Sequence, residues 1–262
     1  MIRALYSAAS GMTAQQMNVD NIANNLANAN TTAYKARRTQ FQDLVYQNLV
    51  QPGAAASQQS TVPTGLQVGL GTRPSANEIL FSQGSFSETD NPLDVVVQGS
   101  GFFQIKQPSG EIAYTRDGSF QINSTGNIVT SSGALVEPQI TIPPQAQAIN
   151  IASDGTVSYT LSGQSATQLA GQLQLANFQN PAGLNGIGGN LYLPTDASGQ
   201  PVVSNPGQEG AGTLMQGYLE QSNVNIVEEF VNLIAAQRGY EANSKVVKAA
   251  DEMYQQVNQI TQ

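Results

Sequence analysis

The sequence predicts an α+β protein in which long N- and C-terminal helices form a coiled-coil-like layer, with a central antiparallel all-β domain inserted between them. Two patterns predict this architecture. Large apolar residues recur every seven positions near both ends, as in packed helices. In the middle of the chain, apolar residues occupy every second position in short runs separated by turn signals. The expected segments are a coiled-coil helix at 1–33, a connecting domain at 34–90, the β domain at 91–204, a return segment of the connecting domain at 205–223 and a coiled-coil helix at 224–262.

The N-terminal helix is predicted from one apolar stripe. Its six large residues lie at seven-residue intervals or at the three- and four-residue spacings between them: Ile2, Leu5, Met12, Val19, Ile22 and Leu26. Residues 27–32 are rich in Asn and Thr, whose side chains compete for backbone hydrogen bonds, so the helix is expected to end there. Burying six such side chains contributes about 12 kcal/mol, less than the backbone entropy of ordering the segment. We therefore expect the stripe to pack against other helices and other copies.

The connecting domain contains a stretch of low complexity at 47–65, with Pro52-Gly53 followed by Ala, Ser and Gln residues. Such a composition predicts a flexible surface loop. Its place between a terminal helix and the β region also makes it a candidate for packing between subunits.

The β domain is predicted from short apolar runs separated by turn signals every eight to ten residues. The expected strands lie near 93–97, 102–105, 112–115, 120–122, 128–130, 139–142, 148–151, 156–161 and 168–178. Residues 180–212 are rich in Gly and Pro, so they are expected to form a long loop with a single strand near 191–193. Consecutive short strands of this kind favour antiparallel pairing.

The C-terminal helix is predicted over about 225–260, again from a seven-residue repeat. The residues expected to pack between subunits are Ile226, Phe230, Leu233, Tyr240, Val247, Tyr254 and Val257. Charged residues lie beside them, with Arg238, Lys245 and Lys248 three or four positions from acidic residues. Two interpretations stay open: a solvated face, or charges that select a neighbouring helix.

The composition excludes most catalytic classes. The chain has no His and no Cys, which removes imidazole bases, thiolate nucleophiles and the usual zinc sites. Its net charge of −8 argues against nucleic acid or anionic membrane as the main partner. No apolar run is long enough to span a membrane or to act as a secretory signal, so we expect retention or export by a route that reads no such signal. The basic cluster of Lys35, Arg37 and Arg38 beside Tyr34 is interpreted as a solvated helix exit.

Motifs for ligand chemistry are also missing. Gly99-Ser100-Gly101 lacks the third glycine of a dinucleotide fingerprint. The candidate carboxylates are Asp90, Asp94, Glu111, Asp117, Asp154 and Asp196, and turn or surface roles explain each of them. We expect no catalytic residue, metal or cofactor. The enzyme alternative is a polysaccharide hydrolase that uses two of these carboxylates on a β scaffold.

Four groups of residues together form a specific signature. They are Asn24, Asn25, Leu26, Asn28, Tyr34 and Lys35; Gly99, Gly101, Phe102 and Phe103; Arg116 and Gly118; and Asn223, Asn225, Arg238, Tyr240, Glu241, Asn243 and Lys245. This signature resembles that of the bacterial flagellar rod and hook proteins over essentially the whole chain. The length and the 47–65 stretch are most similar to the distal rod type. Ala33 stands where the family often has Gly, so its turn is expected not to need a positive φ, and Gly239 replaces the usual Ala at a cost of about 1 kcal/mol unless a neighbour approaches closely.

The resemblance implies a structural, self-assembling protein. Its terminal helices would form concentric coiled coils around an export channel, in a helical tube that crosses the periplasm and transmits torque. The implied partners are other copies, proximal rod proteins, the hook protein, the outer-membrane and peptidoglycan ring proteins, and the flagellar type III export apparatus. A proximal rod or hook subunit is the nearest alternative. Deleting 47–65 is predicted to prevent formation of a straight, rigid rod if the distal type is correct.

Overall fold

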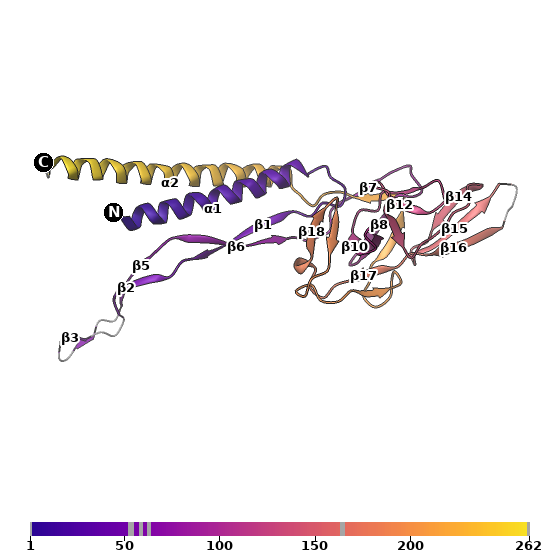
Figure 1. The fold of residues 1–262 in the computed structure, drawn as a ribbon, viewed down its shortest axis with the longest axis horizontal. Helices are drawn as coiled ribbons and strands as arrows, with labels where there is room; N and C mark the ends of the chain where they lie inside the picture. Colours follow the sequence, from indigo (N-terminus) through magenta and orange to yellow (C-terminus); the bar gives the residue numbers. More distant parts are fainter. Residues whose placement is uncertain (1, 52–54, 58–59, 62–63, 163–165, 261–262) are drawn as a thin grey trace. The chain divides into compact units, whose positions relative to one another are not determined.

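The computed structural model describes residues 2–51, 55–57, 60–61, 64–162 and 166–260. The chain divides into two compact units (Figure 1). Unit 1 comprises Met1–Ala27, Arg37–Ile79 and Asn225–Gln262, and unit 2 comprises Asn28–Ala36 and Leu80–Val224. The chain therefore passes between the units four times. The five segments expected from the sequence stay a prediction.

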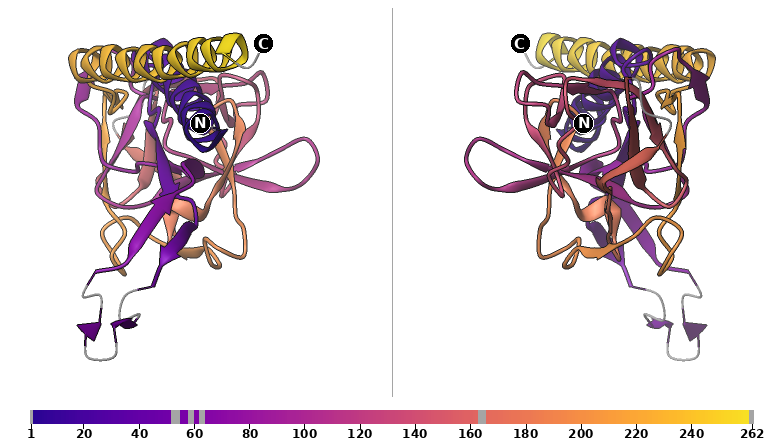
Figure 2. Two further views of the ribbon diagram at one scale, coloured as in Figure 1. Left: turned by 90° about the vertical axis from the view of Figure 1, so that its left-hand side faces the viewer. Right: turned by 90° about the vertical axis from the view of Figure 1, so that its right-hand side faces the viewer.

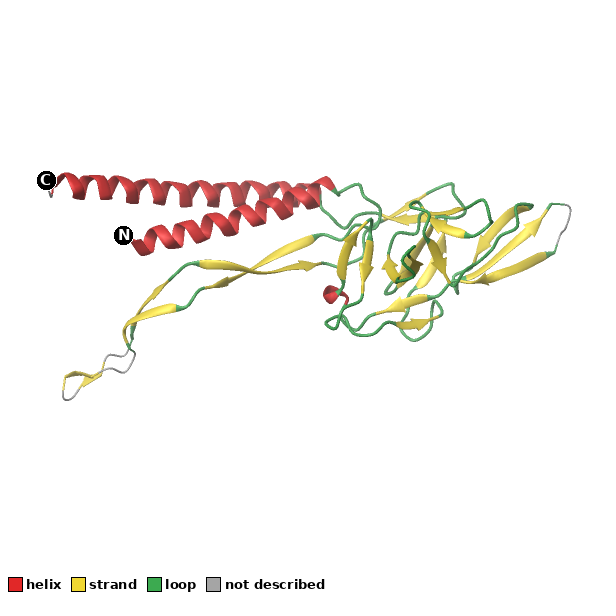
Figure 3. Ribbon diagram, in the orientation of Figure 1, coloured by secondary structure: helices red, strands yellow, loops and turns green. Residues whose placement is uncertain are grey.

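Unit 1 contains two long helices, α1 (Ile2–Ala27) and α2 (Ile226–Ile260), close to the predicted bounds. They pack antiparallel, since Gly11 lies against Asn243 while Gln15 lies against Gly239 (Figure 3). The buried positions on the two helices are mostly small: Ala8, Ala14, Ala236 and Ala250. Because the large stripe residues are mostly not buried in this pair, the coiled-coil-like layer remains a prediction.

The remainder of unit 1 is a series of two-stranded antiparallel sheets along one hairpin. β1 (Arg37–Asp43) pairs with β6 (Thr72–Ile79), β2 (Tyr46–Val50) with β5 (Leu66–Gly69), and β3 (Ala55–Ser57) with β4 (Ser60–Thr61). The flexible loop expected at 47–65 is therefore wrong for the described residues, because the segment folds back and pairs its two arms. Residues 52–54, 58–59 and 62–63 of that stretch lie outside the described residues.

Unit 2 is built on a nine-stranded antiparallel sheet. Its main path runs β11 (Phe120–Ile122), β12 (Ile128–Thr130), β13 (Leu135–Glu137), β9 (Phe102–Lys106), β10 (Ile112–Thr115), β19 (Leu191–Leu193) and β18 (Asn185–Gly188), with β17 (Leu175–Asn177) joining β9 to β20 (Val202–Ser204). β9 pairs with β10, β13 and β17, so it is the centre of the sheet. A short 3-10 helix, Pro181–Gly183, precedes β18.

Smaller antiparallel sheets complete unit 2; Figure 1 labels several of their strands, and Figure 2 shows the same ribbon from two further sides. They are β14 (Ala146–Ile151), β15 (Thr156–Leu161) and β16 (Thr167–Gln172); β8 (Val95–Gln98) with β21 (Thr213–Gln216); and β7 (Phe86–Glu88) with β22 (Tyr218–Glu220). The strand expected at 139–142 is wrong, because flanking prolines leave only an isolated bridge at Thr141. The strand in this part of the chain is β13, which ends before the first of these prolines. The strand expected at 168–178 divides into β16 and β17, and the expected loop at 180–212 also contains β18 and β20.

The hydrophobic core lies within unit 2. It joins strands of several sheets through fully buried side chains: Val95, Val97, Phe103, Ile105, Phe120, Val157, Leu173 and Leu175. Phe103 and Phe120 meet edge to face with ring centroids 5.0 Å apart. Within the described residues, neither α1 nor α2 combines the length and hydropathy needed to cross a bilayer.

Candidate assembly surface

Several signature residues meet in a buried charge cluster of unit 2, which we call the junction cluster (Lys35, Arg116, Glu220 and Asn223). Lys35 Nζ donates to Glu220 Oε1 at 2.6 Å and to the Ser82 carbonyl at 2.8 Å. Burial lowers the pKa of the Lys35 ammonium, while the charge and hydrogen bond of Glu220 oppose that shift. The expected solvated helix exit is therefore wrong for Lys35, because its side chain is buried against Glu220. That partner lies 185 residues away in the sequence.

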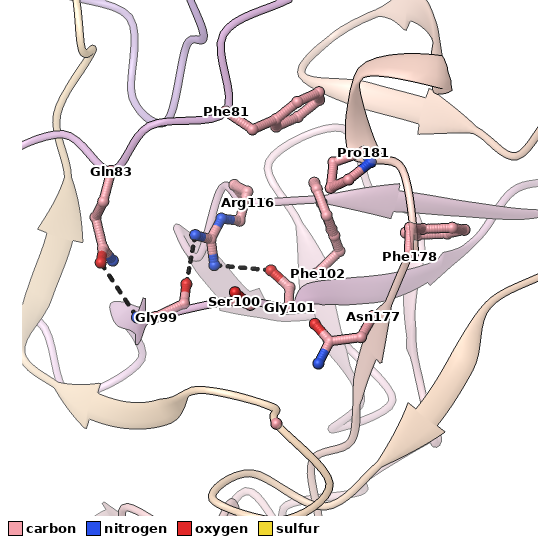
Figure 4. A pocket seen from close by; sticks show the side chains of 11 residues that line it. Phe81, Gln83, Gly99, Ser100, Gly101, Phe102, Arg116, Asn177, Phe178 and Pro181 are labelled. Carbon is pink, nitrogen blue, oxygen red and sulfur yellow. Dashed lines mark hydrogen bonds between the residues drawn. The ribbon is translucent and has the colours of Figure 1, made fainter. Parts of the chain in front are cut away.

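Arg116 links the cluster to the glycine motif (Figure 4). Its Nη1 donates to the Gly101 carbonyl at 2.7 Å and its Nη2 to the Gly99 carbonyl at 2.6 Å. Its Nε lies 3.7 Å from Glu220 Oε2, and its guanidinium carbon lies 5.6 Å from the centroid of the Phe102 ring. Gly99 and Gly101 have φ of +102° and +133°, which glycine alone adopts without strain. The motif thus shapes a backbone bend around the buried cation.

A cavity of about 460 Å³ lies beside Arg116 in unit 2. Figure 4 shows Phe81, Phe102, Phe178 and Pro181 on its walls. Gln83 also lines it, and the Oε1 of that side chain accepts the Gly99 N–H at 3.1 Å. Gly118 lies on the following turn, where an added Cβ would meet the Val95 carbonyl at 1.7 Å. These signature residues therefore meet the steric and hydrogen-bonding needs of the fold.

Asn223 ties together three of the four segments by which the chain enters and leaves unit 2. Its Oδ1 accepts the Ala36 N–H at 2.7 Å, and its Nδ2 donates to the Leu80 and Ser82 carbonyls at 2.8 and 3.1 Å. Glu220 joins the same segments, because its Oε1 also accepts the Gly84 N–H at 2.9 Å. The junction cluster is therefore a structural clamp.

Asn25 performs a similar role in unit 1. Its Oδ1 accepts the Arg37 N–H at 2.9 Å, and its Nδ2 donates to the Arg37 carbonyl at 2.9 Å and to Glu229 Oε1 at 2.9 Å. One buried amide thereby connects α1, β1 and α2. At the start of α2, Asn225 Oδ1 accepts the Val227 N–H at 3.1 Å, which makes Asn225 the N-cap.

The remaining signature residues are dispersed. Arg238 and Glu241 form an exposed ion pair at 3.0 Å, and Asn243 contacts α1 at Gly11. Asn28 Oδ1 accepts from Thr31 at 3.1 Å. Leu26 and Tyr34 are half-buried, whereas Asn24, Tyr240 and Lys245 are exposed and Phe103 lies in the core.

The predicted stripes are only partly covered within one chain. Ile22 is buried, and the half-buried members are Leu5, Met12, Val19, Leu26, Leu233, Val247 and Tyr254. Exposed members are Ile226, Phe230, Tyr240 and Val257, and the side chain of Ile2 lies outside the described residues. A groove of about 370 Å³ follows the helix pair at Val19, Gln237 and Tyr240.

The first three turns of α2 carry the most exposed apolar surface of either helix. We call this the α2 apolar face, formed by Ile226, Val227, Phe230, Val231 and Ile234, whose side chains are 43% to 72% exposed. The seven-residue repeat predicted Ile226 and Phe230 but missed the other three. Val227, Val231 and Ile234 follow the i, i+4, i+7 spacing, so the signal was present in the sequence. A contiguous patch of this kind is typical of a protein interface.

The hairpin of unit 1 exposes a second apolar set. Large side chains stand exposed on or between β1, β2 and β5: Phe41, Val45, Tyr46, Leu49, Val50 and Leu66. A two-stranded ribbon has few side chains to cover them, so unit 1 presents apolar residues on both of its parts.

Known proteins are similar in sequence to this chain along nearly its whole length. Residues 5–35 match the family model "Flagella basal body rod protein", residues 96–159 match "Flagellar hook protein FlgE/F/G D1 domain", and residues 215–260 match "Flagellar basal body rod FlgEFG protein C-terminal". The flagellar basal-body rod protein FlgG of Buchnera aphidicola (Schizaphis graminum) is 48% identical over 99% of this chain and 100% of its own. FlgG of Caulobacter vibrioides is 49% identical over 99% of both chains.

The chain belongs to the FlgG family of flagellar basal-body rod proteins. It is a structural subunit of the flagellar distal rod and not an enzyme. Among solved structures, the Helicobacter pylori flagellar hook protein FlgE2 is similar at 15% identity over 71% of this chain and 43% of its own, with a TM-score of 0.25. The assignment to the rod family rests on the sequences.

The two departures from the rod family pattern have different outcomes. Ala33 has φ +55°, so the expectation that its turn avoids a positive φ is wrong. The Ala33 N–H donates to the Glu220 carbonyl at 2.8 Å, a contact that holds this conformation despite a cost of about 1–2 kcal/mol. At Gly239 an added Cβ would meet Gln15 at 3.4 Å, an ordinary contact, so the single chain has room for Ala there.

The candidate carboxylates of this rod-family chain either accept hydrogen bonds within turns or lie exposed on the surface. Buried Asp94 accepts hydrogen bonds from Thr89 and Asn91, both at 2.8 Å. Asp117 caps the Ser119 N–H, and Asp154 caps the Thr156 N–H, whose hydrogen bond lowers the pKa of Asp154. The other three are exposed: Asp90, Glu111 and Asp196. Across the described residues, no group of three or more His, Cys, Asp or Glu is placed to hold a metal ion.

Proposed function

We propose that copies of this chain assemble through unit 1 into a helical tube that spans the periplasm, transmits torque and encloses the channel for later subunits. Its neighbours would be other copies along the tube, proximal rod proteins and the hook protein at the ends, and the outer-membrane and peptidoglycan ring proteins around it. It would reach that place through the flagellar type III export apparatus. The family assignment supports this proposal.

The observation that carries the proposal is the α2 apolar face. Fully burying a large apolar side chain contributes about 1.5–3 kcal/mol, and its five members are roughly half exposed in the single chain. Covering them would therefore add several kcal/mol per contact. A second copy is the natural occupant, because a rod is built from repeated subunits.

The geometry of such a contact would be heterologous. A helical tube needs one surface of a copy to meet a different surface of the next, so that the contact repeats without closing. The groove at Val19, Gln237 and Tyr240 is a concave feature of unit 1 that shares no residue with the α2 apolar face. The exposed set on the hairpin offers a further contact surface.

The test replaces the α2 apolar face without weakening the helix. In Val227→Gln/Ile234→Gln the new residues favour helix at least as well as the old, so α2 should be retained. Asn232→Gln is the matched control, because Asn232 is exposed and polar on the same turns. We expect the double variant to keep the circular dichroism and thermal midpoint of the monomer but to form no tubes by electron microscopy. Tube formation equal to that of the control would contradict the proposal.

A further inference from the structure

The charges of the chain are divided very unevenly between the two units. Unit 1 holds seven Lys and Arg against eight Asp and Glu, a net charge of −1. Unit 2 holds three against ten, a net charge of −7. Nearly all of the acidity of the chain therefore belongs to the β domain, while the unit with the apolar faces is close to neutral.

Burial sharpens this division. Two of the three cations of unit 2, Lys35 and Arg116, are buried in the junction cluster, where Glu220 is the carboxylate that faces both. The third, Lys106, is half exposed and pairs with Glu137 at 3.2 Å. Among the described residues, the surface of unit 2 therefore carries one cation, already paired, against many exposed carboxylates.

Five of these carboxylates are exposed and make no side-chain hydrogen bond or ion pair with any described residue: Glu88, Asp90, Glu111, Asp196 and Glu209. Their contribution to the fold is small, so their main effect is the negative field around unit 2. Like charges on neighbouring copies repel over the Debye length, which is about 30 Å at 0.01 M salt and about 10 Å at 0.1 M.

From this division we infer that unit 2 opposes the self-association that unit 1 drives, so that ionic strength controls polymerisation. The inference rests on the proposed assembly into a tube. A second copy is the partner concerned: its nearly neutral unit 1 can dock, whereas its unit 2 is repelled until counterions screen the field. Low salt keeps the chain monomeric, and salt releases assembly.

The experiment compares three full-length chains of similar fold. The neutralised chain carries Glu88→Gln, Asp90→Asn, Glu111→Gln, Asp196→Asn and Glu209→Gln, which moves the net charge from −8 to −3. The acidified chain carries Gln121→Glu, Gln139→Glu and Gln179→Glu at exposed positions of unit 2, which moves the net charge to −11. All eight changes preserve side-chain size, and equal thermal midpoints at high salt would confirm that folding is unchanged.

Sedimentation measures the critical concentration for assembly between 20 and 300 mM NaCl, and electron microscopy verifies tubes. For the unaltered chain, we expect the critical concentration to fall at least about fivefold across this range. The neutralised chain should assemble at 20 mM almost as readily as at 300 mM, and the acidified chain should require more salt than the unaltered one.

Three other outcomes would overturn either the inference about salt or the proposed self-assembly. The same salt dependence in all three chains would overturn the inference, because it would show that salt acts on apolar contacts rather than on the charge of unit 2. Assembly that weakens with salt would overturn it as well and would point to ion pairs between copies. Failure of the unaltered chain to form tubes at any salt concentration would instead contradict the proposed self-assembly itself.

Discussion

Unit 1 and unit 2 bury their apolar residues in opposite ways. Unit 2 encloses Val95, Phe103 and Ile105 completely within one core. Unit 1 leaves large apolar side chains exposed on α2 and on the hairpin, and the buried positions of its helix pair are mostly alanines. Unit 2 also exposes some large apolar side chains, among them Leu169 and Val202, but unit 1 exposes many more and has no comparable buried core of large side chains. This difference supports the proposal that the rod subunit makes its contacts through the terminal helices and the hairpin.

Two phenylalanines, one in each unit, should differ most in what their loss does to monomer stability. Phe103→Ala leaves a cavity in the core of unit 2 and should cost about 3–5 kcal/mol of unfolding free energy. Phe230→Ala removes an exposed ring of the α2 apolar face and should change monomer stability by less than about 1 kcal/mol, yet it should impair assembly. Urea unfolding of the monomer and sedimentation under assembling conditions check both halves. Similar losses of monomer stability would show that the two units do not differ as described.

A smaller contrast concerns two ion pairs. Glu220→Gln leaves Lys35 and Arg116 buried without a carboxylate and should destabilise unit 2 by about 3 kcal/mol. The control is Glu78→Gln, which breaks the solvent-exposed pair with Arg38 in unit 1 and should change the free energy of unfolding far less. Denaturant titration of both variants gives the comparison. An equal cost would mean that Glu220 is not a structural clamp.

The smallest contrast lies within the helix pair. Gly239→Ala meets only ordinary contacts with Gln15 and should stabilise the monomer by about 1 kcal/mol through helix propensity. In Gly11→Ala the new methyl group would approach Asn243 Nδ2 to 2.8 Å, so displacement of that side chain should cancel most of the same gain. Thermal unfolding distinguishes the two variants. A larger gain for Gly11→Ala would contradict the antiparallel register described for α1 and α2.

The sequence predicts those features that depend on local periodicity. The apolar repeats place both helices, and the alternation between Asp-Gly and similar turns places β9, β10, β11, β12 and β15 to within about two residues. The strand near 139–142 is wrongly predicted because Pro138 and Pro143 flank a segment whose apolar side chains are buried without forming a ladder. Period alone does not distinguish a buried loop from a strand.

Local sequence patterns do not predict features that depend on residues far apart in the chain. Nothing near Lys35 indicates that Glu220 will neutralise it, and nothing near Ala33 indicates that the Glu220 carbonyl will hold it at a positive φ. The composition of 47–65 does not predict a hairpin, because its residues have weak strand propensity. Pairing of β2 with β5 outweighs that weak propensity in the structure. By contrast, the i, i+4, i+7 spacing of Val227, Val231 and Ile234 is a local signal in the sequence that lies outside the seven-residue repeat.

The proposed assembly requires the α2 apolar face to become covered when copies associate. Hydrogen exchange followed by mass spectrometry, on the monomer and on sedimented tubes, measures this directly. We expect amides of residues 226–234 to exchange much more slowly in the tube, while the core strands of unit 2 exchange slowly in both states. Unchanged exchange at 226–234, with new protection confined to unit 2, would contradict the claim.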